Sequence, residues 1–464
     1  MNGTAKGAKG AKFLIGTPVV LEPRNTRKAR KLEMWKFFEM NSSRGRANGW
    51  MRRAIGGVLL GVLFSCVAVG EDDFGDLKSP AHGYWDRPLK DPFSLRMEEF
   101  RDGTIPLDRS SERAFLRSLL EEFEIPISSQ LLVFSTTSLQ LRLISPRNPR
   151  AIYFDEDVYI GFIPGGRIEI ISMDPDLGGI FYIFDIPSPG PKLGERPIVF
   201  ERSDRCMNCH SDAETRNVPG LTIRSVIPGP RGGSMDSFRR DQNGHQIAID
   251  QRFGGWHVTG DEGFGKHWGN VIGNYTKDGL VTSAVPPGRE FDFSRYLTKT
   301  SDLLPHLILE HQAGFVNVVL EASYRARYYE DESEGKLTPE QNATLDRMAG
   351  EVVLYLLFAE EAALPGKVKG DAAYREAFLQ KRKTDAAGRS LRDFDLKTRI
   401  FKYRCSYMVY SNVFIGMPDE MRNRVKNRLR GALTGDGNFD YLPDEEKRAI
   451  LSILRETLPD FGDL

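Results

Sequence analysis

The chain has 464 residues, of which 64 are Lys or Arg and 64 are Asp or Glu, so its formal net charge is zero. This balance argues against a nucleic-acid-binding protein, because such proteins need a net basic surface to displace counterions from phosphate. Hydrophobic residues make up 40% of the chain and charged residues 28%, which is typical of a globular protein and excludes a disordered one. The length allows two or three domains.

The N-terminal residues have the pattern of an export signal. A Met-Arg-Arg triplet precedes an uncharged run over 54–69, which is shorter than the roughly 20 residues needed to cross a bilayer. We therefore expect residues 51–70 to be a signal peptide, and the basic residues 1–50 to be an extension upstream of the true start, Met51. The alternatives are an uncleaved membrane anchor and a lipid on Cys66. Each interpretation predicts an exported or periplasmic protein, and both alternatives add membrane association.

The next segment combines an irregular arm with a helix and a sheet. Residues 71–106 are rich in Asp, Pro and Gly, which predicts an irregular arm. Residues 107–125 have helical periodicity, and Ser110 or Ser111 can cap the helix. β-Branched and aromatic runs, separated by Pro, Gly and Asn, then predict an antiparallel sheet packed on this helix. Residues 107–199 are therefore predicted to form one α/β sheet domain.

The rest of the chain divides into a loop-rich region and a helical block. Residues 200–298 are rich in glycine and have few helical patterns, whereas residues 299–464 have helical patterns nearly to the end. Proline and acidic residues at 338–341 and 442–445 are typical of helix starts, where the helix dipole favours negative charge. The predicted fold class is therefore α+β: an N-terminal helix with an antiparallel sheet, a loop-rich region and a C-terminal all-helical block.

The loop-rich region contains a C-x-x-C-H motif at Cys206, Cys209 and His210. Two residues between the cysteines allow both thiols to form thioethers with the two vinyl groups of one haem, and the adjacent histidine can bind the iron as proximal ligand. Covalent haem attachment follows export, which agrees with the N-terminal signal. The motif therefore predicts one covalent haem c, held in residues 200–298.

Two other uses of paired cysteines fit the sequence less well. A structural zinc site needs four ligands, and the remaining downstream cysteine, Cys405, lies far along the chain in a helical run. A thioredoxin-like pair belongs at the start of a helix within a βαβ unit, whereas residues 221–227 after the motif read as a strand. We expect Cys405 to be a buried apolar thiol, and His306 and His311 to be buried hydrogen-bonding residues of a helix.

The sixth iron ligand decides what a haem does. Methionine or histidine there gives a saturated iron suited to electron transfer, whereas an open position admits a diatomic ligand or peroxide. Met235 is a credible axial thioether, and His245, His257 and His267 are the alternatives in the same region.

Other residues of the region suit the periphery of a haem. Propionates need cationic partners, and tryptophan can stack on the macrocycle, as Trp256 or Trp268 would. The arginines that flank the motif are Arg202, Arg205, Arg216 and Arg224.

Several segments carry a set of motifs: AIYFDEDVYIGFIPGG, ISMDPDLGGIFYIFD, RCMNCHSDAETRNVPGLTIRSV, FGGWHVTG, KHWGNV, LILEHQAGFVN and FKYRCSYMVYSNVFIGMP. Together, over most of residues 130–430, they resemble a family of exported, single-haem c-type proteins of unassigned role. The resemblance implies a c-type cytochrome domain, haem binding and electron transfer. The histidine of KHWGN recurs in that family, so His267 joins Met235 and His210 as a predicted metal ligand. The family differs at His257 and has no clean match for His245, which argues against both as ligands.

Three functions follow from these observations. The first is an exported c-type cytochrome that passes single electrons to a partner protein, with Cys206 and Cys209 as thioether positions and His210 as proximal ligand. The second is a peroxidase-like haem enzyme or a sensor with an open distal site, where His267 or Glu262 would act as an acid–base group. The third is a structural module, in which the haem-bearing loop joins the two halves of the protein.

Overall fold

The computed structural model describes residues 73–186, 198–237, 243–435 and 439–462. The predicted extension at 1–50, the predicted signal at 51–70 and Cys66 lie outside the described residues.

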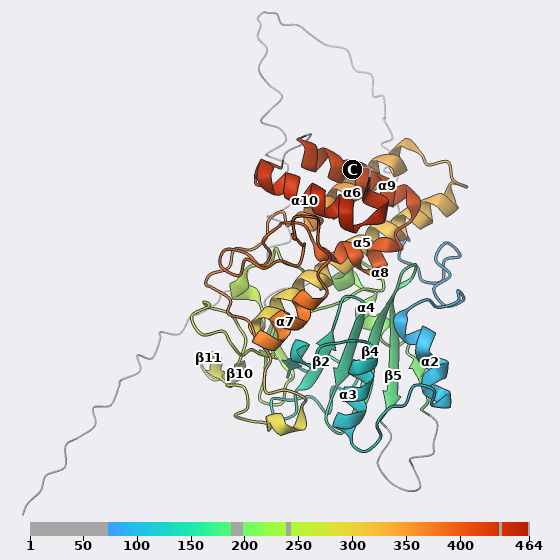
Figure 1. The fold of residues 1–464 in the computed structure, drawn as a ribbon. Helices are drawn as coiled ribbons and strands as arrows, with labels where there is room; N and C mark the ends of the chain where they lie inside the picture. Colours follow the sequence, from blue (N-terminus) through green and yellow to red (C-terminus); the bar gives the residue numbers. More distant parts are fainter. Residues whose placement is uncertain (1–72, 187–197, 238–242, 436–438, 463–464) are drawn as a thin grey trace, which may run out of the picture. The chain divides into compact units, whose positions relative to one another are not determined.

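An antiparallel sheet occupies the middle of the chain, as predicted (Figure 1). Its strand order is β6-β5-β4-β3-β2-β1-β9, so that β2 to β5 form a meander and β9 comes from the loop-rich region. The strands are β1 (Leu131–Val133), β2 (Arg150–Phe154), β3 (Val158–Phe162), β4 (Arg167–Asp174), β5 (Gly178–Asp185), β6 (Glu201–Arg202) and β9 (Trp256–His257).

Two helices precede the sheet. The helix predicted over 107–125 is confirmed as α3 (Glu112–Glu122), and the side chain of Ser111 accepts a hydrogen bond from the backbone N–H of Ala114. The predicted irregular arm at 71–106 was partly wrong, because it contains α2 (Pro92–Asp102). Asp91 caps this helix, and proline stands at its first position, which is a pattern that starts helices.

The two faces of the sheet pack against different partners, because successive side chains of a strand point to opposite faces. On one face, Ile170 of β4 and Tyr182 of β5 share a core with α2 and α3. On the opposite face, Phe154, Tyr159 and Met173 join the core of the C-terminal helices. The second face is the one turned towards the C-x-x-C-H motif.

The C-terminal block is helical, as predicted, but not throughout. Residues 381–406 between α7 and the next short helical turn were expected to be helical and instead form turns, such as the one in which Asp385 accepts from the N–H groups of Ala387 and Arg389. The helices are α5 (Leu303–Glu332), α6 (Pro339–Leu356), α7 (Ala372–Gln380), α8 (Asn412–Ile415), α9 (Asp419–Thr434) and α10 (Asp444–Thr457).

Helix α5 runs through the core of this block. It is long and apolar enough to cross a membrane by length and composition, yet its most apolar window is entirely buried by the surrounding protein. Its partners include α6 and α9, which lie together above it in Figure 1. This burial is what a central core helix of a folded protein shows.

The loop-rich region is built from short elements, as expected. One helical turn, α4 (Met207–His210), carries the motif, and four strands of the region pair into two small sheets. The paired strands are β7 (Val226–Pro228) with β8 (Ser234–Ser237), and β10 (Val271–Thr276) with β11 (Gly279–Ala284).

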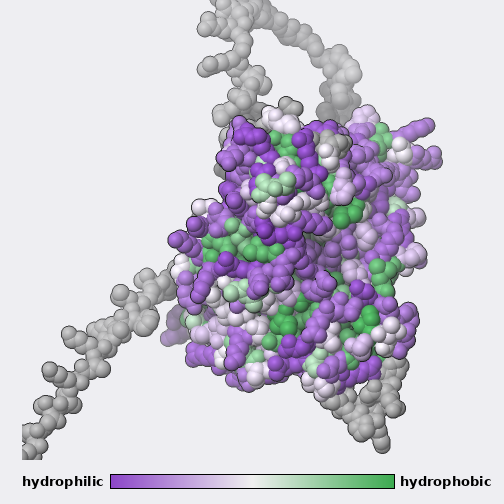
Figure 2. Space-filling view, viewed as in Figure 1, coloured by the Kyte–Doolittle hydropathy of each residue, from purple (hydrophilic) through white to green (hydrophobic). Residues whose placement is uncertain are grey.

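On the face of the molecule drawn in Figure 2, hydrophilic residues predominate and hydrophobic ones form separate small groups.

The described residues from 73 to 462 pack as one unit, which includes parts of all three predicted regions, 107–199, 200–298 and 299–464. One hydrophobic core includes Val133 of the sheet, Trp256 of the loop-rich region and Leu320 of α5.

Candidate haem-attachment site

One helical turn brings the three motif residues together. Cys206 stands at the N-cap of α4, and its carbonyl accepts from the N–H groups of Cys209 (3.1 Å) and His210 (3.0 Å). Residues three and four apart share one face of a helix, so both thiols and the imidazole project to the same side. Both cysteines are free and half-buried, and burial raises the pKa of the Cys206 thiol.

His210 is fixed by two hydrogen bonds to a single residue, Gly220. The Nδ1 of His210 lies 2.9 Å from the carbonyl oxygen of Gly220, and the N–H of Gly220 donates to the carbonyl of His210 at 2.9 Å. Because a carbonyl can only accept, Nδ1 carries the proton and Nε2 keeps its lone pair. Burial, together with the charge of Arg150, lowers the pKa of His210 to about 4, so the ring is neutral at pH 7. A neutral imidazole oriented through Nδ1 is the form that binds a metal through Nε2.

Helix α5 holds Gly220 in place through Asn317. The side chain of Asn317 accepts from the N–H of Leu221 at 2.8 Å and donates to the carbonyl of Leu221 at 2.7 Å. A Cβ added to Gly220 would lie 2.1 Å from Oδ1 of Asn317, so this close approach requires glycine. The orientation of His210 therefore depends on a helix that lies about 100 residues away in the sequence.

The sheet supplies the other wall of the site. The ring of Phe181 on β5 lies 4.8 Å from the ring of His210. An ion pair on the same face joins Arg150 of β2 to Glu169 of β4 at 2.8 Å, across β3. Gly161 of β3 lies beside this pair, where a Cβ would be in ordinary van der Waals contact with Oε2 of Glu169 at 3.4 Å.

The four arginines that flank the motif differ in whether they are free to pair with a haem propionate. Arg202 donates to the carbonyl of Tyr84 and lies over the rings of Tyr84 and Trp85, each at 4.8 Å. Arg216 is paired with Glu321 at 2.6 Å. These two arginines are therefore committed to contacts within the protein.

Arg224 and Arg205 remain beside the motif. Arg224 pairs with Glu214 at 2.8 Å, and its guanidinium also reaches the thiol of Cys209. The charge of Arg205 acts on Cys206.

Arg150 of β2 was not predicted from the sequence. Its Nε is buried without a hydrogen-bond partner. A buried, unused donor next to the motif fits the carboxylate of a haem propionate.

His267 is held away from a ligand role by its own hydrogen bonds. Its Nδ1 accepts from the N–H of Gly269 at 3.0 Å, and its Nε2 donates to Asp261 at 3.0 Å. The hydrogen bond from His267 lowers the pKa of Asp261 more than any other interaction does. In this arrangement neither nitrogen of His267 offers a lone pair to an iron.

Met235 lies on β8, where its sulfur packs against the small sheets. Cβ atoms added to Gly229 and Gly273 would lie 3.1 Å and 3.5 Å from this sulfur. Among the described residues, the hydrogen bonds and ring contacts of His210 involve neither Met235 nor His267.

The two other histidine candidates are buried elsewhere. Nδ1 of His245 lies 2.8 Å from Nδ1 of His311 on α5, and the two rings stack. His257 lies between Phe134 and Phe291, at 4.5 Å and 4.9 Å, and the side chain of Asn270 interacts with its ring.

The remaining sequence candidates have structural contacts. Trp256 is buried in the main core and donates from Nε1 to the carbonyl of Arg224 at 3.0 Å, which ties β9 to the site. Trp268 lies under Lys266 at 5.8 Å. His306 is confirmed as a buried hydrogen-bonding residue, and burial raises the pKa of the fully buried Cys405 thiol far above its usual range.

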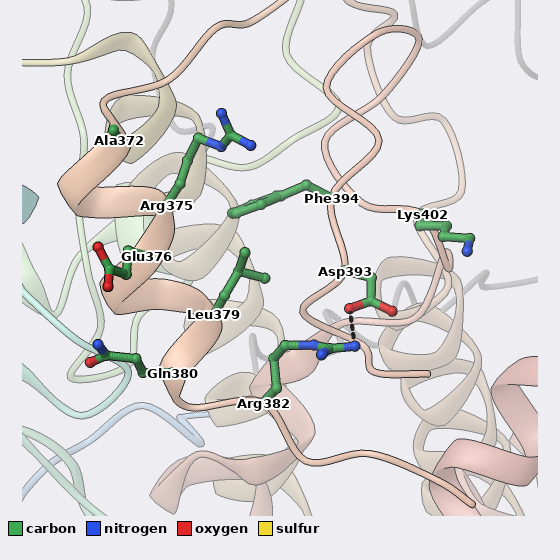
Figure 3. Close-up of a pocket in the computed structure, with 9 residues that line it drawn as sticks. All are labelled: Ala372, Arg375, Glu376, Leu379, Gln380, Arg382, Asp393, Phe394 and Lys402. Carbon is green, nitrogen blue, oxygen red and sulfur yellow. Dashed lines mark ion pairs between the residues drawn. The ribbon is translucent and has the colours of Figure 1, made fainter. Parts of the chain in front are cut away.

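A hollow of about 910 Å³ lies on the protein surface between α7 and the segment around Phe394 (Figure 3). None of the motif residues lines it. Figure 3 shows Glu376 and Lys402 pointing to opposite sides, and Arg382 is paired with Asp393 at 2.7 Å. Its polar side chains do not converge, so we place no site there. Among the described residues there is also no cluster of three or more His, Cys, Asp or Glu side chains that could hold a metal ion.

Comparison of the chain with protein-family models, with curated proteins and with solved structures finds no match. The family resemblance noted from the sequence therefore stays a prediction.

Proposed function

We propose that this chain is an exported c-type cytochrome that binds one covalent haem and passes single electrons to a partner protein. In this proposal Cys206 and Cys209 form the thioethers, and His210 is the proximal ligand. One observation carries the proposal: both thiols share a helical face with an imidazole whose Nδ1 is bonded to Gly220 and whose Nε2 is free.

The protein's own residues then have defined tasks. Gly220 holds the proton of His210 on Nδ1, which orients the ring and strengthens Nε2 as a donor to a metal. Arg205 and the Nε of Arg150 are the cationic donors available to propionates, whereas Arg224 would share its charge with Glu214. A bound haem supplies a one-electron couple, and the surrounding charges and burial set its potential.

A second candidate is a haem protein with an open sixth position, such as a sensor or a peroxidase-like enzyme. The occupied nitrogens of His267 and the contact of His245 with His311 favour it, because both residues would have to rearrange to act as ligands.

The test is expression of the full chain with a periplasmic c-type maturation system. We expect a pyridine haemochrome spectrum of c type and a mass increase of one haem in the wild type, and loss of both when Cys206 and Cys209 are replaced by serine. Cys405→Ala is the control and keeps the haem. A wild-type chain without covalent haem would refute the proposal.

Carbon monoxide separates the two candidates. No change in the spectrum of the reduced protein, together with a low-spin iron, supports the electron carrier. A shift on adding carbon monoxide supports the open sixth position instead.

A further inference from the structure

The Arg150–Glu169 pair is held rigidly on the sheet. Oε1 of Glu169 accepts from Ser138 Oγ at 2.6 Å and from Gln140 Nε2 at 3.0 Å, while Oε2 pairs with Arg150. Burial alone would raise the pKa of Glu169, but Arg150 and these hydrogen bonds outweigh it and leave the pKa below its usual value. Glu169 is therefore ionised at neutral pH.

Water screens this pair poorly. Only 16% of the Arg150 side chain and 19% of the Glu169 side chain are exposed. Charges at such sites interact more strongly with their neighbours than surface charges do, because the local dielectric constant is low.

Both charges act on the haem-attachment residues. The pair lies on the same sheet face as Phe181, whose ring is 4.8 Å from that of His210, and the two charges influence His210 with opposite signs. Sequence alone does not indicate this, because the two residues stand on different strands and look like ordinary polar positions of a sheet.

We propose that the Arg150–Glu169 pair sets the reduction potential of the haem bound at Cys206, Cys209 and His210. The inference rests on the proposed function. Reduction adds one electron to the iron, from an electrode or a partner protein, and makes or breaks no bond in the chain. The negative charge of Glu169 opposes that electron, and the positive charge of Arg150 favours it.

Replacing Glu169 and replacing Arg150 should shift the reduction potential in opposite directions. Glu169→Gln leaves Arg150 unbalanced, so at a fixed applied potential the ratio of reduced to oxidised protein rises about tenfold, which is about 59 mV for a one-electron couple. Arg150→Met lowers this ratio. It also removes the charge that keeps Glu169 ionised, so the potential gains a dependence on pH and falls as pH rises through the new pKa of Glu169.

The matched control is another well-buried pair. Arg404 and Glu446 lie 2.6 Å apart with 16% and 9% of their side chains exposed, and Glu446 belongs to α10. Glu446→Gln removes a similar charge pair outside the site, and we expect it to leave the potential unchanged. Spectroelectrochemical titration of the haem-loaded full chain measures all three variants. Shifts of Glu169→Gln and Arg150→Met no larger than that of the control would overturn the inference.

If the proposed function is wrong, the result is different, because the wild-type chain then carries no covalent haem at all.

If Glu169→Gln does not fold, Ser138→Ala takes its place. It preserves every charge and removes one hydrogen bond that keeps Glu169 ionised. We expect a small rise in potential that is larger at low pH, and an unchanged potential would count against the inference.

Discussion

At the scale of single residues, Gly220 connects His210 to the rest of the protein. Its carbonyl and its N–H both bond His210, and its missing side chain lets Asn317 approach. A methyl group at this position has no space, since it would lie 2.1 Å from a buried side-chain oxygen.

Gly220→Ala should therefore lower the free energy of unfolding by about 1–3 kcal/mol, the usual cost of overpacking. It should also weaken haem attachment by displacing the ring of His210. Urea denaturation and the haem content of the purified chain measure the two effects.

Gly233→Ala is the control, because a Cβ there meets nothing within 4 Å. Equal losses of stability and haem in the two variants would contradict a special role for Gly220.

The sequence predicts part of this site and omits the rest for a physical reason. The spacing of Cys206, Cys209 and His210 is local, so one helical turn suffices to bring them together. Arg150 and Glu169 reach the site only through strand pairing, and neither has a local pattern that separates it from other polar strand residues. His267 was predicted as a ligand from a resemblance of sequence, yet only the structure reveals its bonds to Asp261 and Gly269.

At the scale of elements, α5 links the helical block to the attachment site. Asn317 makes two hydrogen bonds to the backbone of Leu221, and both partners are buried. Asn317 therefore fixes the backbone next to Gly220, and Gly220 in turn fixes His210.

Asn317→Leu keeps most of the volume but leaves the N–H and carbonyl of Leu221 unpaired. We expect a loss of about 1–3 kcal/mol in the free energy of unfolding, because buried polar groups without partners are costly. The imidazole should also lose its fixed orientation, which the absorption and electron paramagnetic resonance spectra of the haem-loaded chain report.

Ser323→Ala on the same helix is the control. Its hydroxyl donates only to the carbonyl of Val319 in its own helix, so its loss should leave both spectra unchanged. An Asn317→Leu protein with wild-type spectra would show that α5 does not position His210.

Element predictions from the sequence succeeded where the periodicity was strong and local. Helix α3 has both a clear apolar face and a serine cap. Helix α2 was missed because it buries only Phe93 and Phe100 and exposes Leu95, so its apolar residues do not form one clear face. Residues 381–406 were assigned to helices, although Arg392 is held there by long-range contacts, with Glu156 of the sheet region and the rings of Phe378 and Tyr407.

At the scale of the whole molecule, the three predicted regions depend on one another. β9 of the loop-rich region completes the sheet, and α5 packs beneath it. Composition and periodicity describe each region separately and contain no information on such pairings. A consequence of this shared core is that most histidines are buried in it.

Six histidines have pKa values below the ordinary value of 6.5, and burial is the leading cause for each. The pKa falls to about 4 for His82, His210 and His306, to about 3 for His257 and His311, and well below 6.5 for His245.

This burial predicts acid unfolding. The unfolded chain takes up protons below pH 6.5, whereas the folded chain does so only near pH 3 to 4. The free energy of unfolding should therefore be constant with respect to these groups above pH 6.5 and should fall steeply as the pH drops from 6.5 towards 4. Circular dichroism during urea titrations at several pH values measures the slope.

His257→Phe gives the sharpest test of this account. The ring of His257 already lies between two phenylalanines, so the variant removes one titrating group, at the cost of an interaction with the side chain of Asn270. Between pH 6 and 4 the slope of unfolding free energy against pH should decrease by up to about 1.4 kcal/mol per pH unit, the contribution of one proton. Phe291→Leu alters the packing of the same ring without changing any titrating group, so it should lower stability equally at every pH. If His257→Phe leaves the slope as it is in the wild type, His257 is not a source of the acid sensitivity.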